Sequence, residues 1–251
     1  MGVKQNKAWR ASEKMDAIVL AAGLGKRLRP HTLETPKPLL PVQGRPILDW
    51  ILDALPRQVR RVLVVVSYLA DRIEKFIQAR NDGRVYMAVH QAQPRGTGDA
   101  LKTCQPYVES SRFLVLNGDD LYAAADLGAL AQYEAAMLAY PVDTPWLYGV
   151  VFTRLDGTLD RLVEKPQLSG RHLANIGAYC LPYRVFDIEI ALSPRGEYEI
   201  TDYVTQLAQR QPLAVVPATF WYPIGTVEAW QRTSQLDLSP LVHKATSRIR
   251  N

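Results

Sequence analysis

The sequence predicts an α/β protein with a Rossmann-like, doubly wound sheet, and three observations support this fold class. Apolar runs alternate with amphipathic helical stretches through the first half of the chain, which is the pattern of βαβ units. A glycine-containing loop follows the first apolar run, and two adjacent carboxylates follow the fourth. Ligands of doubly wound sheets bind outside the carboxyl ends of the strands, so both features are expected at one edge of the sheet.

The elements can be justified in chain order. Four runs have the apolar and β-branched content of buried parallel strands: 16–22, 61–67, 84–90 and 112–117. Helices are expected between them at 47–55, which places Ile47, Ile51 and Leu55 on one face, at 69–79 and at about 99–108. From Trp146 onward we expect consecutive strands with few helices, the later helices lying in DYVTQLAQ and TVEAWQRTSQL.

The composition predicts one soluble domain. The 251 residues, 47% of them apolar and 22% charged, are enough for a sizeable core. The sequence has no linker rich in Pro, Gly or Ser and no internal repeat. We therefore expect a single domain at 16–238, with two halves that meet near residue 125. Basic tails, 1–15 and 239–251, are expected to be flexible.

The distribution of charge argues against a nucleic-acid partner. The net charge is +5, but residues 1–15 carry +3 and the stretch after Pro240 another +3, so the body is near −1. No apolar run reaches the roughly 18 residues of a membrane span, and the N-terminus has no apolar signal region, so we expect a cytoplasmic protein with no membrane contact. Cys104 and Cys180 lack metal-like spacing and are expected as reduced thiols. The oligomeric state stays open, a homo-oligomer included.

The loop in LAAGLGKRLRPHTLETPKPLL predicts a phosphate site. Gly23 and Gly25 let the backbone turn tightly and present N–H groups to an anion. A dinucleotide fingerprint needs a third glycine, where this chain has Leu28, and a Walker loop needs Ser or Thr after Lys26, where this chain has Arg27. What remains is a loop that wraps a nucleoside triphosphate without either motif.

The stretch LAAGLGKRLRPHTLETPKPLLPVQGRPIL resembles the signature of the sugar-1-phosphate nucleotidyltransferases. The resemblance continues, in the order of that family, through QPRGTGDAL, LNGDD, LVEKP, ANIGAY, GEYEITD and IGT, and it is closest to the uridylyl- and thymidylyltransferases. It implies the type A nucleotidyltransferase fold, a three-layer αβα arrangement around a mixed sheet with a nucleotide half and a sugar half. It also implies an Mg²⁺-dependent transfer of a nucleotidyl group, from UTP or dTTP by preference, to a sugar 1-phosphate, with release of pyrophosphate.

Phosphoryl transfer between two polyanions needs positioning and charge neutralisation, which explains the residue types at the reacting centre. Arg27 can offer a planar fork to the triphosphate, and Lys37, flanked by prolines, adds a compact charge near the α-phosphate. By resemblance Asp119 is the metal ligand, at the end of a buried strand, while Asp120 is assigned to the turn or to supporting contacts. Lys165 would neutralise the phosphate of the sugar.

The resemblance also assigns the two substrate sites. Gln91 carries a donor and an acceptor that can match a pyrimidine's imide edge, and the backbone around Gly96 and Thr97 can approach the base. In the sugar half, Glu164 and Asn175 would bind hydroxyl groups and Gly149 would leave room for them; Thr201 is a weaker candidate that could instead help to start a helix. The full set of nucleotide-binding candidates is Leu20, Ala21, Ala22, Gly23, Gly25, Gln91, Gly96, Thr97 and Gly118.

One position departs from the family's pattern. The family often has an aspartate as a second metal carboxylate two residues before the glycine of its DIGT segment, whereas this chain has Pro223 in WYPIGT. Asp119 could then hold the metal with water and phosphates, another carboxylate could substitute, or activity could be lost. Two alternatives therefore stay open: a nucleotide-sugar-binding regulatory homologue without turnover, and a cytidylyltransferase that acts on a small phosphate such as phosphocholine.

Overall fold

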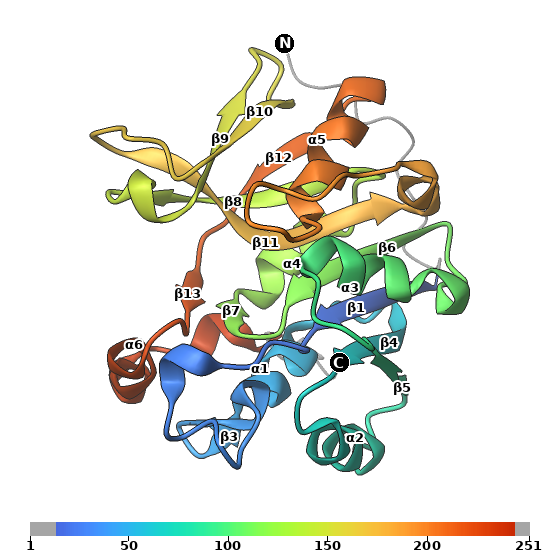
Figure 1. Ribbon diagram of the computed structural model, residues 1–251, viewed down its shortest axis with the longest axis vertical. Helices are drawn as coiled ribbons and strands as arrows, with labels where there is room; N and C mark the ends of the chain where they lie inside the picture. The colour runs from blue at the N-terminus through green and yellow to red at the C-terminus, as the bar shows by residue number, and fades with distance from the viewer. Residues whose placement is uncertain (1–13, 244–251) are drawn as a thin grey trace, which may run out of the picture.

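The computed structural model describes residues 14–243, and a nine-stranded mixed sheet forms its centre (Figure 1). The main path of the sheet runs β10-β9-β11-β6-β1-β4-β5, and β8 pairs with both β11 and β12. The neighbours β6, β1, β4 and β5 are parallel, and β11 joins them antiparallel to β6. The strands are β1 (Met15–Leu20), β4 (Val59–Val66), β5 (Val85–His90), β6 (Arg112–Asn117), β8 (Ala136–Val142), β9 (Gly149–Thr153), β10 (Leu159–Glu164), β11 (His172–Pro182) and β12 (Ala214–Pro217).

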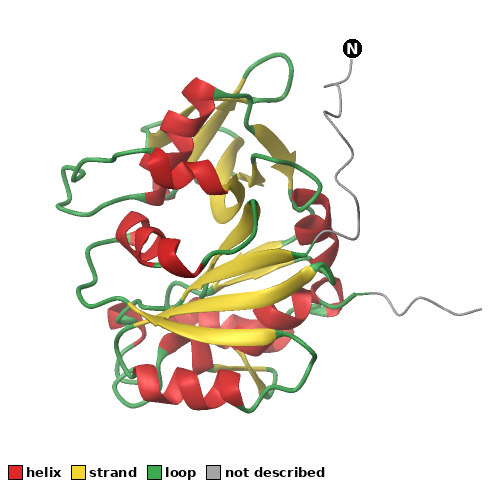
Figure 2. Ribbon diagram, turned by 90° about the vertical axis from the view of Figure 1, so that its right-hand side faces the viewer, coloured by secondary structure: helices red, strands yellow, loops and turns green. Residues whose placement is uncertain are grey.

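Helices cover both faces of the sheet, as Figure 2 shows from the side. One face packs against apolar residues of α1 (Ile47–Ala54), α2 (Ala70–Gln78) and α4 (Ala124–Leu130). The other face packs against α3 (Thr97–Thr103) and α5 (Ile200–Arg210). The α/β fold class, with three layers around a mixed sheet, is therefore confirmed. Two short ribbons lie outside the sheet, β2 (Pro41–Val42) with β3 (Arg45–Pro46), and β7 (Asp120–Tyr122) with β13 (Trp221–Pro223).

Some predicted bounds were wrong for local reasons. The helix expected at about 99–108 begins earlier, at Thr97, and its α-helical part ends at Thr103; a 3₁₀ turn, Gln105–Tyr107, follows it. Pro106 lacks the N–H group that a continuing α-helix requires. The late stretch TVEAWQRTSQL is likewise divided into α6 (Val227–Arg232) and a 3₁₀ turn, Thr233–Gln235.

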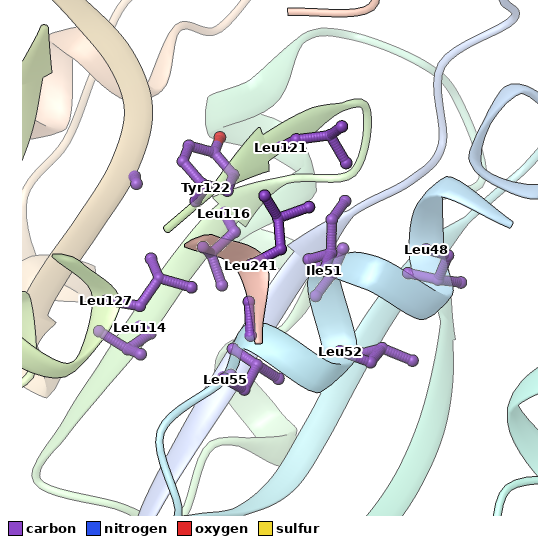
Figure 3. Close-up of a cluster of buried hydrophobic side chains, with 14 of the residues drawn as sticks. Leu48, Ile51, Leu52, Leu55, Leu114, Leu116, Leu121, Tyr122, Leu127 and Leu241 are labelled. Carbon is purple, nitrogen blue, oxygen red and sulfur yellow. The ribbon is translucent and has the colours of Figure 1, made fainter. Parts of the chain in front are cut away.

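The larger apolar cluster lies between the sheet and α1, and Figure 3 shows its central side chains. Leu241, from the 3₁₀ turn Ser239–Leu241, is fully buried in this cluster, and His243 Nε2 lies 2.9 Å from the carbonyl oxygen of Leu55. The start of the predicted C-terminal tail is therefore packed against the domain. At the other end, Met15 is part of β1 and is buried. The remaining tail residues, 1–13 and 244–251, lie outside the described residues.

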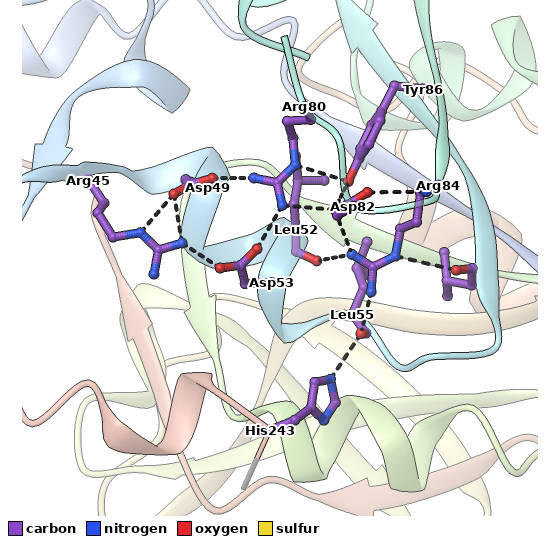
Figure 4. Close-up of polar contacts among 11 residues, drawn as sticks. Arg45, Asp49, Leu52, Asp53, Leu55, Arg80, Asp82, Arg84, Tyr86 and His243 are labelled. Atoms are coloured by element: carbon purple, nitrogen blue, oxygen red, sulfur yellow. Dashed lines mark hydrogen bonds and ion pairs between the residues drawn. The ribbon is translucent and has the colours of Figure 1, made fainter. Parts of the chain in front are cut away.

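A charged network joins α1 to the segment between α2 and β5 (Figure 4). Arg80 forms ion pairs with Asp49, Asp53 and Asp82. Arg84 Nη1 donates to the carbonyl oxygen of Leu52 and Arg84 Nη2 to that of Leu55, both at 2.9 Å. At this end of α1 the carbonyl oxygen of Leu52 accepts a long bond of 3.4 Å from the N–H of Leu55, and the shorter bonds from Arg84 fix the helix beside the β5 edge.

Asp82 gives this network a testable pH dependence. Partial burial opposes ionisation of Asp82, but hydrogen bonds from Tyr86 and Arg80 and from the backbone N–H of Arg84 outweigh it and lower the pKa to about 2. A carboxyl group whose pKa falls on folding stabilises the fold above its ordinary pKa and loses that contribution as pH falls through the folded value. Asp82→Asn should therefore lower the free energy of unfolding at pH 7 by about 1 kcal/mol, the scale of a solvent-screened pair.

Urea denaturation between pH 2 and pH 7 checks this expectation. The difference between wild type and Asp82→Asn should shrink as pH falls from about 4 to about 2, where the wild-type carboxyl becomes neutral. Asp187→Asn, at an exposed position, is the control and should show no such convergence. A difference that stays constant over this range would show that the ionised form of Asp82 does not stabilise the fold.

Candidate functional site

A pocket of about 610 Å³ lies at the carboxyl ends of β1, β5 and β6. Eleven residues assigned from the sequence line it: Leu20, Ala21, Ala22, Gly23, Gly25, Lys37, Gln91, Gly96, Thr97, Gly118 and Asp119. The structure therefore brings the glycine loop, the lysine, the strand-end carboxylate and the Gln91 segment to one cavity. Seven further residues line it that the sequence analysis did not assign: Leu24, Lys26, Pro38, Pro94, Ala100, Asn117 and Glu197.

Gly25 is the glycine that the loop geometry requires. Its φ is +59°, a left-handed value that favours glycine, and a Cβ atom there would lie 2.9 Å from Thr32 Cγ2 and 3.3 Å from Lys37 Cβ. Thr32 Oγ1 also donates to the carbonyl oxygen of Gly25 at 2.8 Å. The close approach of these segments brings Lys37 against the loop although the two are twelve positions apart.

Lys37 and Asp119 form an ion pair at the floor of the pocket. The lysine side chain is only 8% exposed, whereas that of Asp119 is 38% exposed, so water and ligands reach the carboxylate more easily than the amine. Arg27 does not line the main pocket. It lines a smaller adjoining cavity of about 220 Å³, which shares Lys37 and Asp119 with the main pocket. Lys37 and Arg27, the two cations that the sequence predicts to bind the triphosphate, therefore line two adjoining cavities.

Asp120 is buried behind Asp119, with 6% of its surface exposed. Asn117 Nδ2 donates to Asp120 Oδ2 at 3.2 Å, and the Tyr122 hydroxyl lies 3.4 Å from the same oxygen. Burial, together with the charge of Asp119, raises the pKa of Asp120 to about 7. Asp120 therefore supports the turn from inside the protein, as expected, and does not line the pocket.

Pro223 lies directly beside this carboxyl group. It pairs with Asp120 across the β7–β13 ribbon, and the next residue, Ile224, donates its N–H to the carbonyl oxygen of Asp119 at 3.1 Å. The position for which the resemblance implied an aspartate is therefore close to the Asp119 turn, but its proline offers no side-chain ligand.

The donor set suits a magnesium ion that arrives with a nucleotide. Among residues 14–243 no group of three or more His, Cys, Asp or Glu side chains could hold a metal alone. Mg²⁺ often binds through one or two carboxylates together with substrate phosphates and water. Asp119 provides one partly exposed carboxylate in the pocket that the glycine loop also lines. These residues fit such an ion, and Asp119 would be its carboxylate ligand.

Gln91 is positioned differently from the prediction. It is 4% exposed, and its Nε2 donates to Asp99 Oδ2 at 2.8 Å and to the carbonyl oxygen of Gly96 at 3.2 Å. Both amide hydrogens are therefore used inside the protein. The expected donor toward a base is not available, and only the carbonyl oxygen of Gln91 remains as an acceptor.

Three of the predicted sugar residues lie together on β9, β10 and β11. A Cβ atom on Gly149 would lie 3.2 Å from Glu164 Oε2 and 3.8 Å from Asn175 Cβ. Lys165 Nζ lies 3.7 Å from Glu164 Oε1, and Arg195 Nη1 lies 4.0 Å from the same oxygen. Arg195 was not assigned from the sequence, although it directly precedes the GEYEITD motif.

Thr201, the fourth candidate, is not part of this group. It lies in the first turn of α5, after the N-cap residue Glu199, and no hydrogen bond found among the described residues joins it to Glu164 or Asn175. The helix begins one residue earlier, at Ile200, so Thr201 is not its N-cap either.

We call the cluster formed by Gly149, Glu164 and Asn175, with Lys165 and Arg195 beside it, the sugar group. It adjoins the pocket through Asn117 and Gly177. Gly177 has a φ of +70°, and a Cβ atom there would lie 2.0 Å from Nδ2 of Asn117, which lines the pocket. The N–H of Gly177 also donates to Asn175 Oδ1 at 3.2 Å. Only a glycine on β11 lets the end of β6 approach the sugar group this closely.

A family model described as nucleotidyl transferase matches residues 16–239. The chain belongs to this nucleotidyl transferase family. A relative from Methanococcus maripaludis, the bifunctional protein GlmU, is 33% identical over 244 residues, which cover 94% of this chain and 58% of the relative. The catalytic subunit beta of mannose-1-phosphate guanylyltransferase from Drosophila melanogaster is 32% identical over 245 residues, which cover 93% of this chain and 65% of that protein. The chain thus spans less than two thirds of the length of these relatives.

Solved structures agree with the fold. A Bacillus anthracis protein assigned as a glucose-1-phosphate thymidylyltransferase, in complex with a sucrose, superposes with a TM-score of 0.79 at 26% identity, and the match covers 90% of this chain and 96% of that one. A UDP-glucose pyrophosphorylase complexed with UDP-glucose gives a TM-score of 0.77 at 22% identity, over 88% of this chain and 97% of that chain. The names of these proteins include different nucleotides, so membership in the family does not itself identify the base.

Proposed function

We propose that this protein transfers a nucleotidyl group from a nucleoside triphosphate, with UTP or dTTP preferred, to a sugar 1-phosphate. The observation that carries the proposal is the single pocket that joins the glycine loop, Lys37 and Asp119 to the Gln91 segment. The group of Glu164, Lys165 and Arg195 adjoins it and offers two cations beside a carboxylate. This combination suits a triphosphate and a phosphorylated polyol better than a small phosphate without hydroxyl groups.

The reaction is a substitution at the α-phosphorus. An oxygen of the sugar phosphate forms a bond to the α-phosphorus, the bond to the bridging α–β oxygen breaks, and pyrophosphate leaves with the bonding electron pair. No covalent enzyme intermediate is needed, so the protein contributes alignment and charge neutralisation. Lys37 neutralises the reacting phosphate, Arg27 the outer phosphates, and Lys165 the phosphate of the sugar.

Magnesium is the proposed cofactor. When bound, Mg²⁺ would offset the negative charge of the triphosphate. Asp119 is the residue of this chain that would hold it. Lys37 then has a second role, because its ion pair fixes the direction of the Asp119 carboxylate before a nucleotide arrives.

The pyrimidine preference rests on the remaining acceptor of Gln91. Uracil and thymine present one N–H between two carbonyl groups, and the Gln91 carbonyl oxygen can accept from that N–H. A base that turned a lone pair toward this oxygen would leave a polar group unpaired, at a cost of about 1–3 kcal/mol. We therefore expect kcat/KM for UTP or dTTP to exceed that for ATP by at least about tenfold.

An assay of pyrophosphate release tests the proposal. The panel combines UTP, dTTP, CTP, ATP and GTP with several sugar 1-phosphates and with phosphocholine. Turnover with phosphocholine and CTP alone would support the cytidylyltransferase alternative. Binding of nucleotide sugars without pyrophosphate release from any pair would support the regulatory homologue. A purine preference with a sugar 1-phosphate would contradict only the choice of base.

A further inference from the structure

Two segments from different halves of the chain are hydrogen-bonded to each other beside the pocket. We call residues 91–99 the base loop and residues 193–200 the bridging segment. Tyr198 donates its N–H to the carbonyl oxygen of Arg95 at 2.8 Å, and its own carbonyl oxygen accepts from the N–H of Gly98 at 2.7 Å. The N–H of Ile200 donates to Thr97 Oγ1 at 3.0 Å. The bridging segment therefore holds residues 95–98 of the base loop.

The two backbones are in direct contact. A Cβ atom on Gly96, whose φ is +108°, would lie 2.4 Å from the carbonyl oxygen of Tyr198. A Cβ atom on Gly98 would lie 3.0 Å from the carbonyl oxygen of Glu199. No side chain fits between the segments, so a displacement of one backbone must displace the other.

The bridging segment also reaches both substrate sites. Glu197 lines the nucleotide pocket. Arg195 Nη2 donates to Glu199 Oε1 at 2.7 Å, and its other terminal nitrogen lies 4.0 Å from Glu164 in the sugar group. Arg195, the cation next to Glu164, therefore belongs to the same short segment that is hydrogen-bonded to the base loop.

Thr97 is the side chain that makes this connection. Helix α5 begins at Ile200, and its N-cap residue, Glu199, makes no side-chain capping bond. The first N–H groups of a helix lack intrahelical partners. The hydroxyl of Thr97 accepts from the N–H of Ile200, so the base loop caps the helix that follows the bridging segment.

We propose that Thr97 is a positioning residue, which places Arg195 at the sugar phosphate by fastening the bridging segment to the base loop. The inference rests on the proposed function, because it takes Arg195 as a contact of the sugar phosphate. It adds that residues 193–200 connect the base loop to the sugar end of the site.

Steady-state kinetics of Thr97→Val and Thr97→Ser test the role. Valine keeps the volume and removes the hydroxyl group, whereas serine keeps the hydroxyl. Thr97→Val should raise KM for the sugar phosphate about tenfold, the effect of weakening one hydrogen bond to a charged group, and should change KM for the triphosphate much less. Thr97→Ser should resemble wild type. A rise confined to the triphosphate KM, an equal rise in both constants, or no change would overturn the proposal.

Limited trypsin digestion without any ligand gives a readout that does not depend on turnover. The side chain of Arg195, which trypsin recognises, is 54% exposed, and the N–H of the following peptide bond donates to the carbonyl oxygen of Ser193 at 2.8 Å, so cleavage there requires this turn to open. Thr97→Val, and Thr97→Ala as a second variant, should be cleaved there faster than wild type and Thr97→Ser. Cleavage after Arg184, whose side chain is 55% exposed, serves as the internal reference. Equal rates after Arg195 in all variants would overturn the positioning role, whereas wild type that releases no pyrophosphate would contradict the proposed function.

Discussion

Replacing Lys37 by alanine should lower kcat by about 10²–10³-fold, the usual effect of removing one preorganised electrostatic stabiliser. The lysine is 8% exposed, is aimed by flanking prolines and is already paired with Asp119, so its charge needs no reorganisation when a triphosphate binds. Its loss leaves the developing charge on the α-phosphate without this cation. The fold should persist, because the remaining partner, Asp119, is 38% exposed and can be solvated.

A second lysine of the same loop provides the control. Lys26 lines both cavities but is exposed, so water screens its charge. Lys26→Ala should therefore lose much less turnover than Lys37→Ala. The measurement is single-turnover pyrophosphate release at saturating substrates, with thermal melts to confirm folding. If a folded Lys37→Ala protein turns over as fast as Lys26→Ala, the proposed role of Lys37 is wrong.

The sequence was sufficient to predict which residues meet at the pocket, because each of them lies next to a strong local pattern. Gly23, Gly25 and Lys37 follow an apolar strand, and Asp119 ends another. Parallel strands bring their carboxyl ends to the same edge of the sheet, so these residues had to meet once the strands were identified. The apolar character of β1, β4 and β6 therefore determined both the fold class and the location of the pocket.

The remaining errors arose where contacts between segments far apart in the sequence determine the position of a side chain. Gln91 has the chemistry to read a base, but its hydrogen-bond partners, Asp99 and Gly96, are visible only in three dimensions. No local sequence pattern distinguishes Arg195 from a surface cation. Its position depends on the hydrogen bonds between residues 193–200 and the base loop. The buried Leu241 lies in a stretch whose composition is that of a tail, and only its packing against α1 shows otherwise.

The second large effect is expected at Asp119. Asp119→Asn should lower turnover by at least about 10²-fold, because an amide carries no net charge to hold Mg²⁺ or to balance Lys37. Wild-type protein should bind Mg²⁺ tightly only when a triphosphate is present, since no group of three or more His, Cys, Asp or Glu side chains among the described residues could hold a metal alone. Calorimetric titration of Mg²⁺ with and without UTP measures this directly. Unchanged Mg²⁺ dependence of turnover in Asp119→Asn would show that the metal is held elsewhere.

Pro223 allows the converse experiment, in which a carboxylate is added. Residue 223 pairs with Asp120 across the β7–β13 ribbon, so the two side chains lie on one face, and like charges directly opposite each other are destabilising. Pro223→Asp alone should lower the melting temperature, and Pro223→Asp combined with Asp120→Asn should recover it. The double variant should then need less Mg²⁺ for its half-maximal rate than Asp120→Asn alone, because a second carboxylate shares the ion with Asp119. If the double variant folds normally and its Mg²⁺ requirement matches that of Asp120→Asn, a carboxylate at position 223 is not a ligand in this protein, and Asp119 with the substrate phosphates is sufficient.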